Sequence, residues 1–153
     1  MRHSTAVDPY AAPTDETRWL TAEGRARMRT LAPHVEKALG PLTHLFTSPL
    51  VRAVQTADLL AEGIGFKGAI TVHQALAAEF GTTAQALSVL ETLDERATVA
   101  LVTHAPKVRV LAGHLSGEEM LPGFRTGSAC CIDIDRSGTG KIAFWLDPET
   151  PQV

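Results

Sequence analysis

Arg2 and His3 are the first two residues of this chain whose side chains could do chemistry together. An arginine is a permanent cation with forked hydrogen-bond donors, and a neutral imidazole carries a nucleophilic nitrogen near neutral pH. Side by side, the two could bind a phosphoryl group and accept it. Two polar residues at a chain start are usually only solvated, so this interpretation depends on partners further along the sequence.

Two more side chains of the same types each follow a predicted strand. Arg52 comes shortly after Ser48 and Pro49, a pair typical of a helix that starts with a capping serine and a proline in its first turn. His104 follows the apolar run 98–102 and precedes another predicted helix. Helix starts carry free backbone N–H groups that attract anions, which favours anion binding over a solvated arginine or a purely structural histidine.

The apolar residues predict alternating helices and strands. Thr21 is the expected N-cap of the first helix, and Pro33 is expected to bend or break that helix. The expected helices are residues 21–39, 49–62, 83–94 and 107–115. The expected strands are residues 42–47, 69–72 and 98–102, followed by a hairpin of residues 129–135 and 141–146.

This alternation predicts an α/β fold, a three-layer α/β/α sandwich with a largely parallel central sheet and right-handed crossovers. In such sheets, ligands gather beyond the carboxyl ends of the strands. His3 stands at what is expected to be the end of a short N-terminal strand, and the turn at 48–52 and His104 each follow a predicted strand. We therefore expect them to meet in a single site.

Length, composition and charge narrow the class of protein. With 153 residues and 44% hydrophobic content, the chain is expected to form a single domain over residues 1–153. A net charge of -3 argues against nucleic acid and anionic membranes as partners. The chain start does not resemble a signal peptide, and no run is apolar enough to cross a bilayer. Cys130 and Cys131 are adjacent, so we expect reduced thiols and a cytoplasmic protein.

Four segments, in this order, resemble the motifs of the histidine phosphatase superfamily, the phosphoglycerate mutase-like fold. They are Arg2-His3, LTAEG at 20–24, TSPLVRAVQTA at 47–57 and THAP at 103–106. The small size, the histidine-x-proline of the fourth motif and the run FRTGSA at 124–129 are most similar to the SixA-type phosphohistidine phosphatase branch. The resemblance covers nearly the whole chain.

The resemblance implies a role for each site residue. His3 would be the nucleophile that becomes phosphorylated, and Arg2 and Arg52 would clamp the phosphoryl oxygens. His104 would donate to the transferring phosphoryl group. Several fixed cationic donors and an in-line nucleophile also suit a transition state whose charge is spread over three oxygens. No metal or cofactor is expected.

The chain departs from the family pattern at three places. Ser4 follows the Arg-His pair where a glycine or alanine is usual, which adds a side chain near the phosphate. The apolar strand residues that usually precede the pair are missing before Met1, which would leave neighbouring strands unpaired or place the start of the native chain upstream. Glu79 is the nearest candidate for the family's acid, slightly displaced, with Ala75 where a carboxylate is expected.

The displaced acid favours phosphohistidine as substrate, because an imidazole leaving group takes up a proton easily, whereas an alkoxide needs a positioned acid. The expected partner is therefore a histidine-containing phosphotransfer domain. One alternative is a general small-molecule phosphomonoesterase that uses Glu79 as acid. Another is a non-enzymatic or metal-binding domain with His3 and His104 as ligands, although only two histidines converge and no cysteine joins them.

Overall fold

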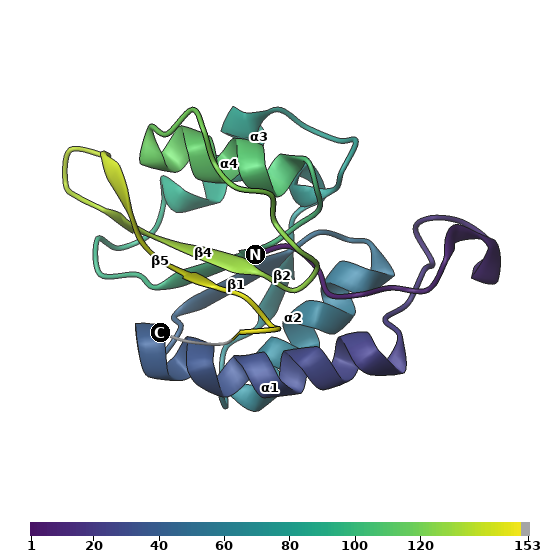
Figure 1. Cartoon of the computed structure of the whole chain (residues 1–153). Coiled ribbons are helices and arrows are strands. Elements are labelled where there is room, and N and C mark those ends of the chain that lie inside the picture. The colour runs from purple at the N-terminus through teal and green to yellow at the C-terminus, as the bar shows by residue number, and fades with distance from the viewer. Residues whose placement is uncertain (151–153) are drawn as a thin grey trace.

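Three short parallel strands form the middle of the molecule in the computed structural model, which describes residues 1–150 (Figure 1). The strand order is β2–β1–β3, with β1 (His44–Thr47) between β2 (Ile70–Val72) and β3 (Val99–Val102). Both neighbours run parallel to β1. The predicted α/β class and its parallel sheet are confirmed. The expected domain extends over 1–153, and residues 151–153 lie outside the described part of the chain.

Helices cover both faces of this sheet, which confirms the three-layer sandwich (Figure 1). On one face lie α1 (Ala22–Leu39) and α2 (Val51–Gly63), and on the other lie α3 (Thr83–Leu87) and α4 (Lys107–Ser116). Short 3-10 turns are formed by Pro9–Ala11, Gln74–Leu76 and Ser88–Leu90. No helix within residues 1–150 has the length and apolar character that crossing a membrane requires.

Helix α1 starts as predicted, because the Thr21 hydroxyl accepts a hydrogen bond from the Gly24 amide. The expected break at Pro33 is wrong, since the helix continues through it to Leu39. Met28, Leu31, Ala32 and Val35 are buried on both sides of the proline. Their packing outweighs the backbone hydrogen bond that a proline removes.

The helix expected at 83–94 is much shorter than predicted. It ends at Leu87, and the 3-10 turn of residues 88–90 follows directly. The start is well defined, because Thr82 and Gln85 form a reciprocal capping box. At the other end the Ser88 hydroxyl donates to the Gln85 carbonyl, a local bond that competes with helix continuation.

The predicted hairpin is confirmed as β4 (Ala129–Ile134) and β5 (Gly140–Leu146), which pair antiparallel. The first residues of the chain connect this hairpin to the parallel sheet. Arg2 forms a parallel bridge with Thr103, and its amide donates to the Ser128 carbonyl at 2.9 Å. Residues 1–3 therefore lie as a very short strand between the end of β3 and the start of β4.

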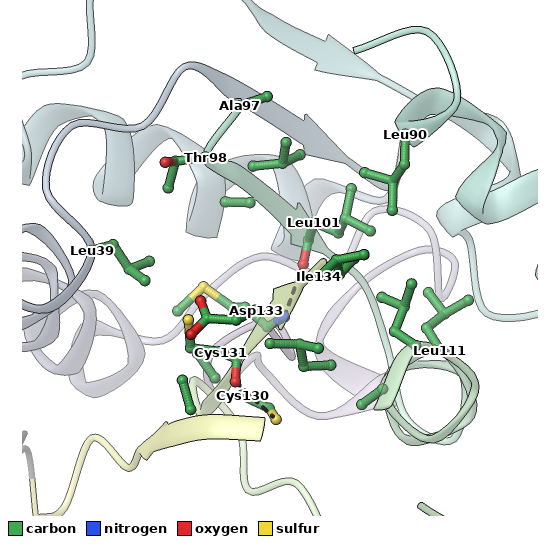
Figure 2. A pocket seen from close by; sticks show the side chains of 18 of the residues that line it. Leu39, Leu90, Ala97, Thr98, Leu101, Leu111, Cys130, Cys131, Asp133 and Ile134 are labelled. Carbon is green, nitrogen blue, oxygen red and sulfur yellow. Dashed lines mark hydrogen bonds between the residues drawn. The ribbon is translucent and has the colours of Figure 1, made fainter. Parts of the chain in front are cut away.

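A cavity of about 1050 Å³ lies beyond Met1, between β3 and β4 (Figure 2). Leu101 on β3, Cys130 on β4 and Leu111 on α4 are among its lining residues. Over residues 1–150 neither strand pairs with a further strand along this cavity, as the missing apolar residues before Met1 led us to expect. Consequently β3 is only partly buried, and Val102 alone among its residues Val99–Val102 is fully covered.

Candidate active site

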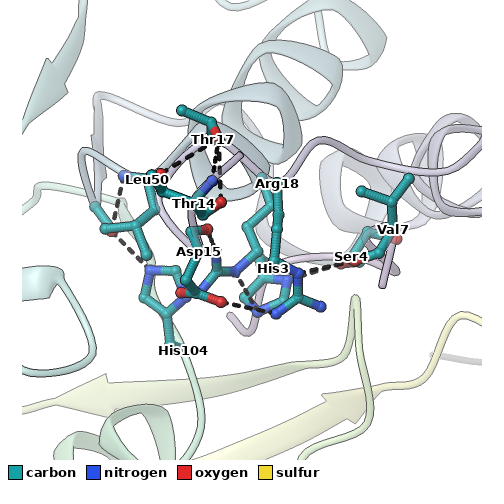
Figure 3. A network of polar contacts seen from close by, with 11 residues as sticks. His3, Ser4, Val7, Thr14, Asp15, Thr17, Arg18, Leu50 and His104 are labelled. Carbon is teal, nitrogen blue, oxygen red and sulfur yellow. Dashed lines mark hydrogen bonds and ion pairs between the residues drawn. The ribbon is translucent and has the colours of Figure 1, made fainter. Parts of the chain in front are cut away.

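His3, Arg52 and His104 meet beyond the carboxyl ends of the strands, as predicted (Figure 3). His3 ends the N-terminal segment, Arg52 lies in the first turn of α2 and His104 follows β3. The His3 and His104 rings are 4.9 Å apart between centroids, and Arg52 Nε is 3.4 Å from His3 Nε2. All three are buried, with exposed fractions of 8%, 5% and 2% for His3, Arg52 and His104.

The tautomer of His3 follows from its hydrogen bonds. His3 Nδ1 lies 2.7 Å from the Ser4 carbonyl oxygen, which can only accept, so Nδ1 carries the proton. The lone pair is therefore on Nε2, where Arg52 Nε donates to it. The pKa of His3 is lowered to about 4, mainly by burial and further by the charges of Arg52 and Arg2, against the opposing effect of the Ser4 carbonyl. His3 is thus neutral near pH 7, with its nucleophilic nitrogen directed at a cationic side chain.

Ser4 is a structural anchor, which corrects the expectation that its side chain lies near the phosphate. Its hydroxyl donates to the Gly24 carbonyl at 2.8 Å, and its amide donates to the Thr56 hydroxyl at 3.0 Å. Ser4 is fully buried between α1 and α2. Gly24 is required at this contact, because a Cβ there would lie 2.2 Å from the Thr5 carbonyl oxygen. These contacts fix the backbone that orients His3.

His104 is held by Ser48, whose hydroxyl lies 2.7 Å from His104 Nε2. The predicted N-cap role of Ser48 is wrong: α2 begins at Val51 after Leu50, and Ser48 Oγ accepts the Leu50 amide at 3.3 Å. Burial, and then the nearby His3 and Arg52, lower the pKa of His104 to about 3. His104 Nδ1 is buried and has no hydrogen-bond partner among residues 1–150.

Arg2 borders the cluster from the other side. Its Nη1 donates to the Phe124 carbonyl at 2.8 Å, which ties the FRTGSA run to the site. Its Nε is buried and without a hydrogen-bond partner in the described part of the chain. Arg2 is close enough for its charge to lower the pKa of His3. Arg2 and His104 thus both present a buried polar atom that a ligand could satisfy.

Glu79, the candidate acid, is not bonded to this cluster. It is exposed and, over residues 1–150, forms no hydrogen bond or ion pair with His3, Arg52 or His104. Ala75 is buried, and its carbonyl accepts a hydrogen bond from Lys107 Nζ at 2.8 Å. Lys107 Nζ also donates to the carbonyls of Ala77 and Phe80, so the loop that carries Glu79 is fixed to the start of α4.

Sequence reasoning missed Asp15 and Arg18, which complete the network around Arg52 (Figure 3). Asp15 Oδ2 lies 2.9 Å from Arg52 Nη2, and Asp15 Oδ1 lies 2.9 Å from Arg18 Nη1. The segment that contains Asp15 and Arg18 has no periodic apolar residues, so its sequence predicts only a loop. The local sequence therefore does not predict the contact with Arg52. The one available signal is a pair of opposite charges spaced i, i+3. Within residues 1–150, no three His, Cys, Asp or Glu side chains are grouped so as to hold a metal ion.

Comparisons with known proteins support the fold. The model of the histidine phosphatase superfamily (branch 1) matches residues 10–82. Phosphohistidine phosphatase SixA of Escherichia coli K12 is 27% identical over 150 residues, covering 97% of this chain and 91% of SixA. A structure of the protein histidine phosphatase SixA complexed with tungstate has a TM-score of 0.87 at 26% identity, covering 97% of this chain and 94% of that one. A SixA structure from Agrobacterium tumefaciens has a TM-score of 0.81 at 22% identity, covering 97% and 95%.

The fold of the chain is the phosphoglycerate mutase-like fold, and its sequence is similar to that of the histidine phosphatase superfamily. The similarity to SixA proteins extends over nearly the whole length of the chain.

Proposed function

We propose that the protein hydrolyses a phosphoryl group by way of a phosphohistidine intermediate on His3, without a metal ion. The observation that carries this proposal is the state of His3: a buried, neutral imidazole whose Nε2 lone pair faces Arg52 Nε at 3.4 Å. Such a nitrogen can attack phosphorus while the guanidinium binds the phosphoryl oxygens. Arg2 and His104 would supply the further donors.

The reaction has two displacements at phosphorus. His3 Nε2 first forms a bond to phosphorus while the bond to the leaving group breaks, and the leaving group takes up a proton. Water then attacks the phosphorus, the bond to Nε2 breaks, and inorganic phosphate leaves. In both steps the fixed donors of Arg52, Arg2 and His104 would face the charge that builds on the phosphoryl oxygens.

We propose a phosphohistidine side chain of a phosphotransfer protein as the substrate. The exposure of Glu79, which forms no hydrogen bond to His3 or His104 within residues 1–150, supports this choice. A phosphoramidate releases an imidazole that is protonated easily, whereas an alkyl phosphate needs a positioned acid. The similarity to a phosphohistidine phosphatase supports the same choice. The competing proposal is a small-molecule phosphomonoesterase that uses Glu79 as acid. Comparing turnover of p-nitrophenyl phosphate with turnover of a phosphohistidine protein distinguishes the two.

The experiment that tests the proposal is trapping of the intermediate. The protein is mixed briefly with a phosphorylated histidine-containing phosphotransfer domain, quenched in alkali, and the acid-labile phosphate is mapped. We expect it on His3 and expect none in His3→Ala, while His114→Ala, which removes an exposed histidine on α4, retains it. A chelator should leave the wild-type rate unchanged. Phosphate on another residue, or turnover by His3→Ala at the wild-type rate, would contradict the assignment of His3 as the nucleophile.

The state of the two cysteines supports the proposal that the protein acts in the reducing cytoplasm. Cys130 and Cys131 are free thiols, both partly buried. Burial raises the pKa of each to about 11, so both are protonated and unreactive near pH 7. They lie on β4, away from His3, and we propose no catalytic role for them.

A further inference from the structure

We propose that Asp15 competes with the phosphoryl group for Arg52 and Arg18, and so weakens the binding of substrate and of the phosphate product. This inference rests on the proposed function, because it takes the pocket beside His3 to be the anion site. It assigns a role in affinity and product release to a residue outside the Arg-His motifs.

The first support is the occupancy of Arg52. All three of its donor nitrogens have partners: Nε donates to His3 Nε2 at 3.4 Å, and Nη1 and Nη2 donate to Asp15 at 2.6 and 2.9 Å. The Nη1 partner is the backbone carbonyl of Asp15, and the Nη2 partner is its carboxylate. A phosphoryl group that binds Arg52 through both Nη atoms therefore competes with Asp15 for the same two nitrogens.

The second support is a second cation on the same carboxylate. Arg18 Nη1 binds Asp15 Oδ1 at 2.9 Å, while Arg18 Nε donates to the Val7 carbonyl at 2.8 Å (Figure 3). The Asp15 carboxylate thus bridges two guanidinium groups, as two oxygens of a phosphoryl group would. Arg18 also lowers the pKa of His3 through its charge, so it lies near the nucleophile. The Asp15 carboxylate therefore occupies the donors that a bound anion would use.

The third support is that the whole turn covers the start of α2. The Glu16 carbonyl accepts the Val51 amide at 3.1 Å, which satisfies one of the free N–H groups that would attract an anion. The backbone carbonyls of Asp15 and Glu16 both accept hydrogen bonds at this site, from Arg52 and Val51. Rotation of the Asp15 side chain alone therefore cannot free these donors. An anion that takes these donors from Asp15 and Glu16 would therefore displace the turn formed by residues 14–17.

The exposed fractions of the two side chains indicate that Asp15, and not Arg52, is the one that an anion displaces. The Arg52 side chain is 6% exposed and is fixed in the site, whereas the Asp15 side chain is 55% exposed on a surface turn. A half-exposed carboxylate binds a guanidinium only weakly in net terms, since it gives up little when it returns to water. A dianionic phosphoryl group offers more charge to the same donors. The contact therefore lowers anion affinity without preventing binding.

The test compares tungstate and phosphate affinities by calorimetry for wild type, Asp15→Asn and Asp8→Asn. Asp8 lies in the same exposed segment and forms no ion pair among residues 1–150, so its substitution is a control for net charge. We expect Asp15→Asn to bind both anions about two- to fivefold more tightly, the range that a half-exposed ion pair supports. Inhibition by phosphate should strengthen by the same factor, and Asp8→Asn should match wild type. Hydrogen exchange in residues 14–18 of the wild type should become faster when tungstate binds.

Unchanged or weaker anion binding by Asp15→Asn overturns the inference, and weaker binding would make Asp15 a positioning residue for Arg52 instead. Tightening of equal size in Asp8→Asn also overturns it, because the effect would then be one of net charge. Failure of the proposed function is a different result. It would appear as the lack of trapped phosphate on His3, which the Asp15→Asn comparison does not involve.

Discussion

The hydroxyl oxygen of Ser48 lies 2.7 Å from Nε2 of His104, although 56 residues of sequence separate them. Ser48 Oγ also accepts the Leu50 amide, so the hydroxyl is oriented by the backbone that enters α2. If that hydroxyl donates its proton to Nε2, the proton of the neutral imidazole is on Nδ1, the buried nitrogen without a partner. Ser48 would then be the positioning residue that directs the donor of His104 into the site.

The first prediction is that Ser48→Ala lowers kcat more than it changes KM. Loss of one buried hydrogen bond costs about 0.5 to 1.5 kcal/mol, which is roughly a two- to twelvefold change. The loss should appear in kcat, because His104 is proposed to act on charge that builds in the transition state. Steady-state kinetics measures the two constants, with Ser88→Ala, which alters an exposed serine after α3, as control. A change in KM alone would show that Ser48 serves ground-state binding.

The second prediction is that Arg52→Ala weakens the binding of phosphate and tungstate as well as slowing turnover. A forked, charge-assisted contact in a buried site contributes about 1.5 to 3 kcal/mol. Arg29→Ala is the matched control, because Arg29 is exposed on α1 and forms no ion pair among residues 1–150. Calorimetry measures the affinities. Equal anion affinity in Arg52→Ala and wild type would mean that Arg52 is only a structural partner of Asp15.

The main site residues could be predicted from the sequence because Arg52 and His104 each follow a strand signal and His3 lies beside Arg2 at the end of a short first segment. A parallel sheet collects the ends of its strands at one edge, so His3, Arg52 and His104 had to converge once the strands were assigned. The hairpin was equally predictable from its alternating apolar residues and the glycines at 138 and 140. In these cases the local pattern and the tertiary structure agree.

The remaining site contacts could not be predicted, since they depend on where a loop folds back. Asp15 lies 37 residues from Arg52 in sequence and in a segment without periodicity. Ser48 has the local signature of a helix cap, but its hydroxyl binds a histidine from another strand end. Glu79 was a candidate by position alone, and the three bonds of Lys107 fix its loop to the start of α4 while Glu79 itself is exposed. Only long-range packing determines such pairings.

The third prediction concerns pH. Because burial lowers the pKa of His3 to about 4, the fraction of neutral His3 is nearly complete at pH 6 and falls only near pH 4. The value of kcat/KM, which reports the free enzyme, should therefore decline on the acid side near pH 4 rather than near the ordinary histidine value of about 6.5. His104→Ala should depress kcat more than substrate affinity. A decline centred at pH 6 to 7 would contradict the buried, neutral His3.

The last prediction concerns the cavity of about 1050 Å³ beyond Met1. In a chain that begins at Met1, the terminal ammonium donates to the Leu101 carbonyl at 2.9 Å at the edge of this cavity. Burial lowers the pKa of that ammonium to about 6 from 8.0. The unfolded chain therefore binds more protons between pH 6 and 8, so the free energy of unfolding should fall as the pH is lowered through this range.

Four apolar, β-branched residues added before Met1 should enter the cavity as a strand between β3 and β4. Each buried aliphatic side chain contributes about 1.5 to 3 kcal/mol, against an ordering cost of about 1 to 2 kcal/mol per residue. The net gain of a few kcal/mol should raise Tm by several degrees and slow hydrogen exchange in β3 and β4. The extension also moves the ammonium out of the buried position, so the stability change between pH 6 and 8 should shrink. An extension of four glycine and serine residues is the control, and an equal Tm for the two extensions would show that the cavity does not accept a strand.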